Sequence, residues 1–144
     1  MITRDGTVTN HIRCAEAFLE AHSRCDPEAE LEDQSKIALP AIVCGAFASE
    51  VALKTLLLLH GKKQHGHDLV ALFSKLPAHL RSQILEGTCL TEAKFNRELE
   101  NARNAFIEWR YFYESENFLM VNVGFLGQLA SVTLAIVHRV ENAA

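Results

Sequence analysis

The apolar side chains of this sequence recur three and four residues apart along most of its length, as they do on one face of an α-helix. No Asn-Gly turn flanked by alternating apolar and polar residues occurs, so nothing favours a β-hairpin. Thr9 or Asn10 can cap a first helix that runs to about Arg24, before Cys25-Asp26-Pro27 ends it. Its predicted apolar face consists of Ile12, Ala15, Phe18 and Leu19.

A second, longer helical region begins near Glu28–Leu31 and continues to His60, where Gly61 stops it. It meets Pro40 on the way. A proline inside a helix removes a hydrogen bond and crowds the preceding turn, so we expect a kink or a fresh start there. Beyond the proline the pattern is apolar nearly all round, which is typical of a central helix: Ile42, Val43, Ala46, Phe47, Val51, Leu53, Leu56 and Leu57.

Two short helices follow a polar loop over residues 61–67. Asp68 can cap the first of them, Leu69–Leu76, because an aspartate side chain accepts hydrogen bonds from the free N–H groups of a first turn. Pro77 ends that helix, and the second covers about Ala78–Glu86.

The most regular helical pattern starts at Thr91, a good capping residue, with Glu92 in the first turn, where an acid suits the helix dipole. We expect one long helix with a buried apolar stripe made of Phe95, Leu99, Ala102, Phe106, Trp109 and Tyr113. A turn at residues 115–117 leads into a last helix that ends at about Val140. These two helices should pair as an antiparallel hairpin.

Together these elements predict an all-α fold, an antiparallel helical bundle of about five main helices. The length of 144 residues suits one well-filled core, so we expect a single domain over residues 1–144. The share of hydrophobic residues, 49%, and of charged residues, 22%, is that of an ordinary globular protein rather than a disordered one.

The compartment is predicted to be the cytoplasm, because Met1–Gly6 lacks the basic start and apolar run of a signal peptide. The apolar runs Leu39–Leu59 and Asn117–Val137 raise the question of a membrane. The first carries Glu50 and Lys54, and the second has many polar and small residues, so buried bundle helices explain both better. Four scattered cysteines without a C-x-x-C pair are expected to be free thiols: Cys14, Cys25, Cys44 and Cys89.

A formal net charge of −4 argues against a body that coats nucleic acid, so any such role needs a local basic patch. Arg103 and Arg110 are seven residues apart, which puts them on one helix face about 10 Å apart. With Asn104 they could form a site for RNA phosphate, because guanidinium matches phosphate geometry. The alternative is that Glu100 and Glu114, one turn outside the arginines, hold them in surface ion pairs.

Glu50 and Lys54 form a pair four residues apart on an otherwise apolar helix. The pair either orients that helix or supports the arginines from a neighbouring position. The histidines His60, His65 and His67 lie across a helix end and a loop without a recognised metal-ligand spacing. We therefore expect no metal, and the absence of a glycine-rich phosphate loop leaves no cofactor to propose.

Three segments in order resemble bacterial proteins with a HEPN domain, a helical domain named for nucleotide binding in higher eukaryotes and prokaryotes. They are Phe47–Leu57, then His67-Asp68-Leu69 with Leu72, then Ala105–Glu114. The resemblance spans roughly residues 40–137, and its order of helices agrees with the helical pattern.

The resemblance implies a helical bundle that dimerises and, in many relatives, a metal-independent ribonuclease of toxin–antitoxin or phage-defence systems. Active HEPN proteins carry an arginine followed by Asn, Asp or His and then, after four to six residues, a histidine. Arg103-Asn104 matches the first part, but the places for the histidine hold Glu108, Trp109 and Arg110. This departure weighs against catalysis, although Glu108 or Arg110 could leave a weak activity.

We therefore expect a cytoplasmic homodimer that binds or acts on RNA in a defence or toxin–antitoxin setting, as a degenerate ribonuclease with a cognate antitoxin or other protein as a possible partner. The candidate site consists of Arg103, Asn104, Glu108 and Arg110, supported by Glu50, Lys54 and Tyr111. The alternative hypothesis is a non-catalytic protein–protein interaction module in which the arginines only set the register. A third is a small-nucleotide sensor.

Overall fold

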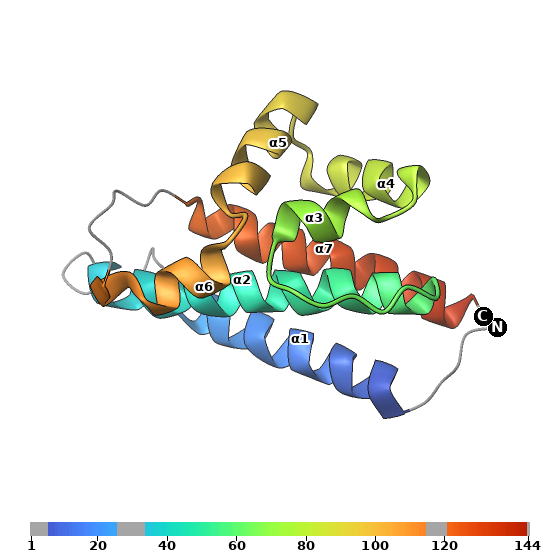
Figure 1. Ribbon diagram of the computed structural model, residues 1–144, viewed down its shortest axis with the longest axis horizontal. Coiled ribbons are helices and arrows are strands. Elements are labelled where there is room, and N and C mark those ends of the chain that lie inside the picture. The colour runs from blue at the N-terminus through green and yellow to red at the C-terminus, as the bar shows by residue number, and fades with distance from the viewer. Residues whose placement is uncertain (1–5, 26–33, 115–120, 144) are drawn as a thin grey trace.

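The computed structural model describes residues 6–25, 34–114 and 121–143, and almost all of them are helical (Figure 1). Within these ranges no strand is present, which confirms the predicted all-α fold. The elements are α1 (Gly6–Arg24), α2 (Gln34–Leu59), α3 (Leu69–Ser74), α4 (Ala78–Thr88), α5 (Glu92–Asn101), α6 (Ala105–Arg110), the 3₁₀ turn η1 (Phe112–Glu114) and α7 (Val123–Asn142).

Helix α2 is the axis of the bundle. The helices α1 and α7 run alongside it, and α3 and α6 also pack against it (Figure 1). The helices α4 and α5 lie farther out, where α4 packs on α7 and α5 packs on α3. This central place explains why the sequence of α2 is apolar nearly all round.

Two helices in the described part of the chain, Ala38–Leu59 and Val123–Asn142, are long and apolar enough to cross a membrane. In the first, 72% of the apolar window is buried inside the bundle, against 44% in the second. Because the core helix of a soluble protein meets the same criteria, length and composition are weak evidence for a membrane span.

One hydrophobic core draws on all seven α-helices. Its largest fully buried side chain is Phe95, whose ring lies 5.1 Å from that of Phe73 and meets Phe125 edge-on at 5.6 Å. These rings join α5 to α3 and to α7. Burying an aromatic side chain of this size contributes about 1.5–3 kcal/mol, so the contacts fix the outer helices on the bundle.

The predicted caps of two helices are confirmed. The Asp68 carboxylate accepts a hydrogen bond from the Ala71 N–H at the start of α3, and the Thr91 hydroxyl accepts one from the Lys94 N–H at the start of α5. The predicted stop after α2 is also confirmed, since Gly61 adopts a φ of +76° there.

A histidine fills the space where α1, α2 and α7 approach one another. The His22 ring lies between Gly45 of α2 and Gly127 of α7, and a methyl group on either glycine would come within 2.7 Å of it. The His22 Nδ1–H donates to the Ala41 carbonyl oxygen over 2.7 Å. The two glycines therefore make room for a side chain that ties the three long helices together.

The prediction of one continuous helix after Thr91 is wrong, because the chain turns between α5 and α6. The Arg103 carbonyl oxygen at this turn accepts the Leu69 N–H over 2.9 Å. The Arg103 side chain binds Asp68, which caps the same helix α3. The Arg103 carbonyl oxygen thus accepts a hydrogen bond from the start of α3 instead of the one that would have continued the helix.

The predicted hairpin of the last two helices is also wrong, since α7 packs mainly on α2, with further contacts to α1 and α4. Pro40 causes no fresh start, because α2 is one helix from Gln34 to Leu59. The predicted helix start at residues 28–31 and the predicted turn at residues 115–117 lie outside the described residues.

Candidate functional site

The three segments that carry the HEPN resemblance meet at one place. The ring of Phe47 in α2 stacks on that of Phe106 in α6, with centroids 4.6 Å apart. His67 comes from the segment before α3, between Phe47 and Phe106 in the sequence. It contacts both α2 and α6. Its Nδ1 is 2.7 Å from Glu50 Oε1, and its ring is 5.3 Å from the Phe106 ring.

Glu50 is a buried carboxylate, 2% exposed, whose two oxygens are both used. Lys54 Nζ donates to Oε2 over 2.9 Å, and His67 donates to Oε1. Because a carboxylate only accepts, the His67 proton lies on Nδ1, and Nε2 remains for another partner. The predicted pair of Glu50 and Lys54 is therefore confirmed, but its third member is a histidine.

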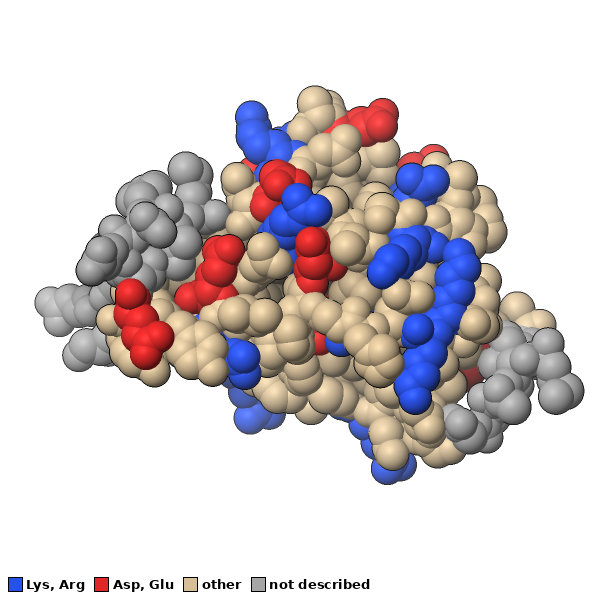
Figure 2. Space-filling model, in the orientation of Figure 1, with Lys and Arg blue, Asp and Glu red and all other residues tan. Residues whose placement is uncertain are grey.

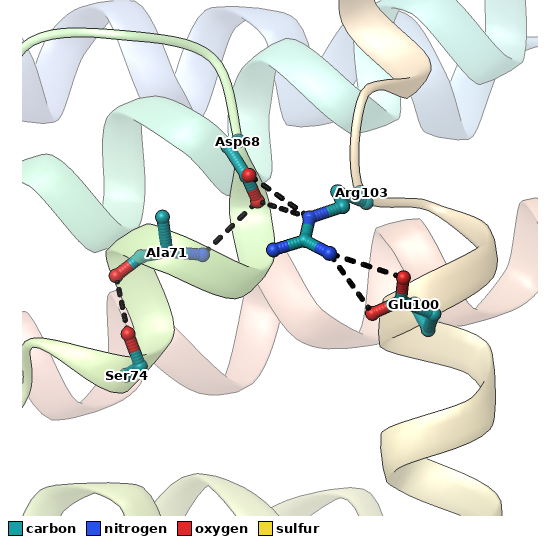
Figure 3. A network of polar contacts seen from close by, with 5 residues as sticks. All are labelled: Asp68, Ala71, Ser74, Glu100 and Arg103. Atoms are coloured by element: carbon teal, nitrogen blue, oxygen red, sulfur yellow. Dashed lines mark hydrogen bonds and ion pairs between the residues drawn. The ribbon is translucent and has the colours of Figure 1, made fainter.

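Arg103 lies in a second network, which Figure 3 shows. It adjoins the first because its member Asp68 directly follows His67 in the chain. The Arg103 Nε donates to both Asp68 carboxylate oxygens at 2.9 and 3.0 Å, and its Nη1 donates to Glu100 Oε1 at 3.1 Å. Burial alone would raise the pKa of Asp68, but hydrogen bonds from the Ala71 N–H and from Arg103, with the arginine charge, lower it. The hydrogen bond and charge of Asp68 raise the pKa of Arg103 in return.

Arg110 is in a different setting, at the end of α6. Its guanidinium carbon lies 4.4 Å from the centre of the Phe106 ring and 5.3 Å from that of Tyr111. No carboxylate of the described residues pairs with it. Within the described residues, the charge of Arg110, unlike that of Arg103, therefore has no carboxylate partner.

An exposed aromatic surface adjoins Arg110. Tyr111 and Phe112 are each 46% exposed and Tyr113 is 77% exposed, so the predicted buried stripe ends before this point. The rings of Trp109 and Phe112 stack in parallel with centroids 5.4 Å apart. We call Arg110 with Trp109, Tyr111, Phe112 and Tyr113 the α6 platform.

The structure divides the predicted site residues into separate groups. Arg103 and Arg110 do not share a helix face, because the turn between α5 and α6 separates them, and this corrects the predicted spacing. The predicted ion pair with Glu100 forms for Arg103. Asn104 is exposed at the start of α6 without capping it, and Glu108 is exposed on the same helix.

The support predicted from Glu50 and Lys54 for the arginines is indirect. Glu50 binds His67, and the His67 and Arg110 side chains contact the same Phe106 ring. His67 was missed as a site residue because it lies 17 positions from Glu50, in a loop without periodicity. The sequence feature that could have identified His67 is its position directly before Asp68, the residue that caps α3.

Charge is unevenly distributed over the molecule. Figure 2 shows basic side chains gathered near the end of α2 and the loop after it, whereas acidic and basic side chains alternate near α5 and α6. Lys62 and Lys75 belong to the first group, since Lys62 Nζ donates to the Lys75 carbonyl oxygen. A protein with a net charge of −4 therefore has a local basic region.

Comparison of this chain with protein-family models, with curated proteins and with solved structures found no match. By its structure, the described part of the chain is an all-α helical bundle. Glu50, which is buried, binds His67 beside a surface of aromatic rings and Arg110.

Proposed function

We propose that this chain is a HEPN-like protein that binds RNA, in a defence or toxin–antitoxin setting, through the α6 platform and His67. The observation that carries the proposal is the meeting of three distant segments at Glu50, His67 and Phe106. Segments that resemble one family and converge on polar and aromatic groups are expected to share a function rather than only a core role.

The α6 platform suits single-stranded RNA in its chemistry. Exposed Tyr111 and Tyr113 rings offer faces on which unpaired bases can stack, which contributes about 1–3 kcal/mol per base. Arg110, already aligned on Phe106, can donate to a backbone phosphate. Arg103 instead joins α3 to α5 through Asp68 and Glu100.

His67 is the group best suited to proton transfer if the protein cleaves RNA. Its Nδ1–H is held by buried Glu50, which orients the ring. Nε2 could accept the proton of a ribose 2′-hydroxyl as that oxygen attacks the neighbouring phosphate. The bond from phosphorus to the 5′-oxygen would then break to leave a 2′,3′-cyclic phosphate, and the 5′-oxygen would take a proton from water. His67 would supply, from another segment, the imidazole that is missing after Arg103.

The binding proposal is tested by fluorescence anisotropy of a labelled single-stranded RNA at several salt concentrations. Arg110→Ala should weaken binding and lower the slope of log affinity against log salt by about one unit, because one phosphate contact is lost. Arg97→Ala, which removes an exposed arginine of α5, is the matched control and should leave both unchanged. Equal effects of the two variants would contradict the proposal.

The second candidate function is a protein–protein interaction module, and the exposed rings of the α6 platform favour it. Tyrosine, tryptophan and arginine are enriched at the energetic centres of interfaces. A second copy or an antitoxin could cover this surface. Light scattering of the wild type and of Tyr113→Ala distinguishes the cases, since a dimer that dissociates on this change, without any RNA binding, supports the module.

A further inference from the structure

A cleft opens between α1 and the segment of residues 61–67, on the α1 side of Glu50. It consists of two adjoining cavities of about 340 and 390 Å³, both lined by His11 and Lys54. Lys63 and His65 line the first cavity, and Phe47 lines the second. Each cavity is in the size range of small-molecule sites.

The first cavity carries an excess of positive charge. Lys63, which lines it, forms no ion pair with any described residue. Lys62 and Lys75 lie outside the lining and donate to a carbonyl and an amide oxygen rather than to carboxylates. Among the described residues that line the cleft, the carboxylate is Glu50, which is buried and shared between Lys54 and His67. Lys63 is thus the lining lysine without a carboxylate partner, and its charge favours an anionic ligand.

Donors reach the first cavity from different elements. Lys54 comes from α2, while Lys63 and His65 come from the loop that follows it. Ammonium and imidazole N–H groups that converge from several directions suit the three outer oxygens of a phosphate group. The Gln64 side chain lines the same cavity and is held by Lys75, which keeps the loop close to α3.

The second cavity differs in character. Its walls include the Phe47 ring, Val51 and the Cys14 thiol, whose pKa is raised by burial and by the charge of Glu50. A protonated thiol behaves as a small apolar group, so this half suits an organic ring or short chain. The two halves together match a molecule with a charged end and an apolar end.

We propose that the cleft between α1 and residues 61–67 binds a small organic phosphate monoester, with its phosphate at Lys54, Lys63 and His65 and its organic group against Phe47 and Val51. The lysines that would hold the phosphate do not belong to the α6 platform, but His67, which is part of the proposed RNA site, also lines the second cavity. A bound ligand would join α1 to the segment that carries His67.

The test uses phenyl phosphate as the probe, with inorganic phosphate and phenol as its two halves, in calorimetry and in ¹H–¹⁵N NMR spectra of the full chain. Phenyl phosphate should bind about tenfold more tightly than inorganic phosphate, because it also buries a ring. It should shift the amide signals of residues 7–14 and 61–67. Phenol alone should not bind measurably.

Two variants separate the two halves of the site. Lys63→Ala, at an exposed position that leaves the core intact, should weaken phenyl phosphate about tenfold, whereas Lys94→Ala on α5 should not. Cys14→Leu should fill the second cavity and weaken phenyl phosphate more than inorganic phosphate. The proposal is supported if Lys63→Ala but not Lys94→Ala weakens phenyl phosphate. It is also supported if Cys14→Leu weakens phenyl phosphate more than inorganic phosphate.

The proposal is overturned if phenyl phosphate fails to bind at millimolar concentration, or binds with equal affinity to the wild type and Lys63→Ala. It is also overturned if single-stranded RNA, and not phenyl phosphate, shifts the signals of residues 61–67, since the lysines would then serve an RNA backbone. Neither result depends on Arg110, so failure here leaves the RNA proposal for the α6 platform to its own test.

Discussion

Glu50 is the centre of the polar cluster that it forms with Lys54 and His67. Its carboxylate is almost wholly buried, yet both of its partners, Lys54 and His67, reach solvent with 18% and 39% of their side chains exposed. The Glu50 charge is thus paired inside the protein, while parts of the Lys54 and His67 side chains remain exposed to solvent. A buried charge without such partners would be strongly unfavourable.

Removal of this carboxylate should destabilise the fold. Glu50→Ala leaves the Lys54 ammonium and His67 without their shared acceptor and creates a gap in α2, so we expect a loss of about 2–4 kcal/mol in the free energy of unfolding. Urea denaturation measures it. Glu86→Ala, at an exposed carboxylate of α4, is the control and should change stability by less than about 0.5 kcal/mol. If Glu50→Ala and Glu86→Ala lowered the free energy of unfolding by similar amounts, the predicted stabilisation by the buried carboxylate would be contradicted.

Asp68 makes the stability depend on acid. Because the pKa of its carboxyl is lowered in the folded protein, its contribution is present above the unfolded pKa of about 3.9 and is lost as the pH falls through the folded value. Asp68→Asn keeps a good helix cap but removes the charge that Arg103 binds. The difference in melting temperature between wild type and Asp68→Asn should shrink below about pH 4; a constant difference would contradict the assignment.

The residues of the site could be predicted only where the signal is local. The Glu50 and Lys54 pair follows from their spacing on one helix, and the Asp68 cap follows from its place before an apolar run. The Glu50 and His67 bond joins positions without a shared period, so it depends on how the loop folds back along α2. The ion pair of Arg103 with Glu100 was predicted, but its second partner, Asp68, was not.

At the scale of elements, three helix ends were predicted well from local sequence. Asp68, Thr91 and Gly61 bound their helices as expected. The predicted cap of the first helix is wrong, because α1 begins at Gly6 and both Thr9 and Asn10 lie inside it. The break between α5 and α6 could not be predicted in the same way, because it results from contacts of Arg103 with the start of α3, 34 residues away in the chain. The apolar stripe of the sequence continues across the turn between α5 and α6, so the sequence pattern does not indicate the break.

The close approach of α1, α2 and α7 should tolerate no extra methyl group. The Cβ of Gly127→Ala would lie 2.5 Å from His22 Nε2, and the ring cannot move freely because Nδ1 binds Ala41, so we expect a loss of about 1–3 kcal/mol. Gly124→Ala, on the same helix, meets only an ordinary contact at 3.4 Å and should be neutral or stabilising by up to about 1 kcal/mol. Thermal unfolding of both variants checks the difference, and equal melting temperatures would contradict the packing.

At the scale of the whole molecule, α2 brings the functional groups together. Phe47, Glu50 and Lys54 follow one another along it over about 10 Å. They meet, in turn, Phe106 of α6, His67 and the basic cleft. The prediction of a central apolar helix was therefore correct, but its few polar residues turned out to organise the surface. Glu50 and His67 line the second cavity of the proposed phosphate cleft, and His67 also contacts Phe106 in the helix that carries the α6 platform.

The most direct measurement uses Trp109, the one tryptophan of the sequence, which lies within the α6 platform. Titration with unlabelled single-stranded RNA should change its fluorescence saturably in the wild type and in Arg97→Ala. The change should be lost or much weakened in Arg110→Ala, because RNA no longer approaches the stacked rings. If RNA binds by anisotropy while the Trp109 emission stays constant, or if no RNA binds to the folded protein, the account of the α6 platform as an RNA surface is contradicted.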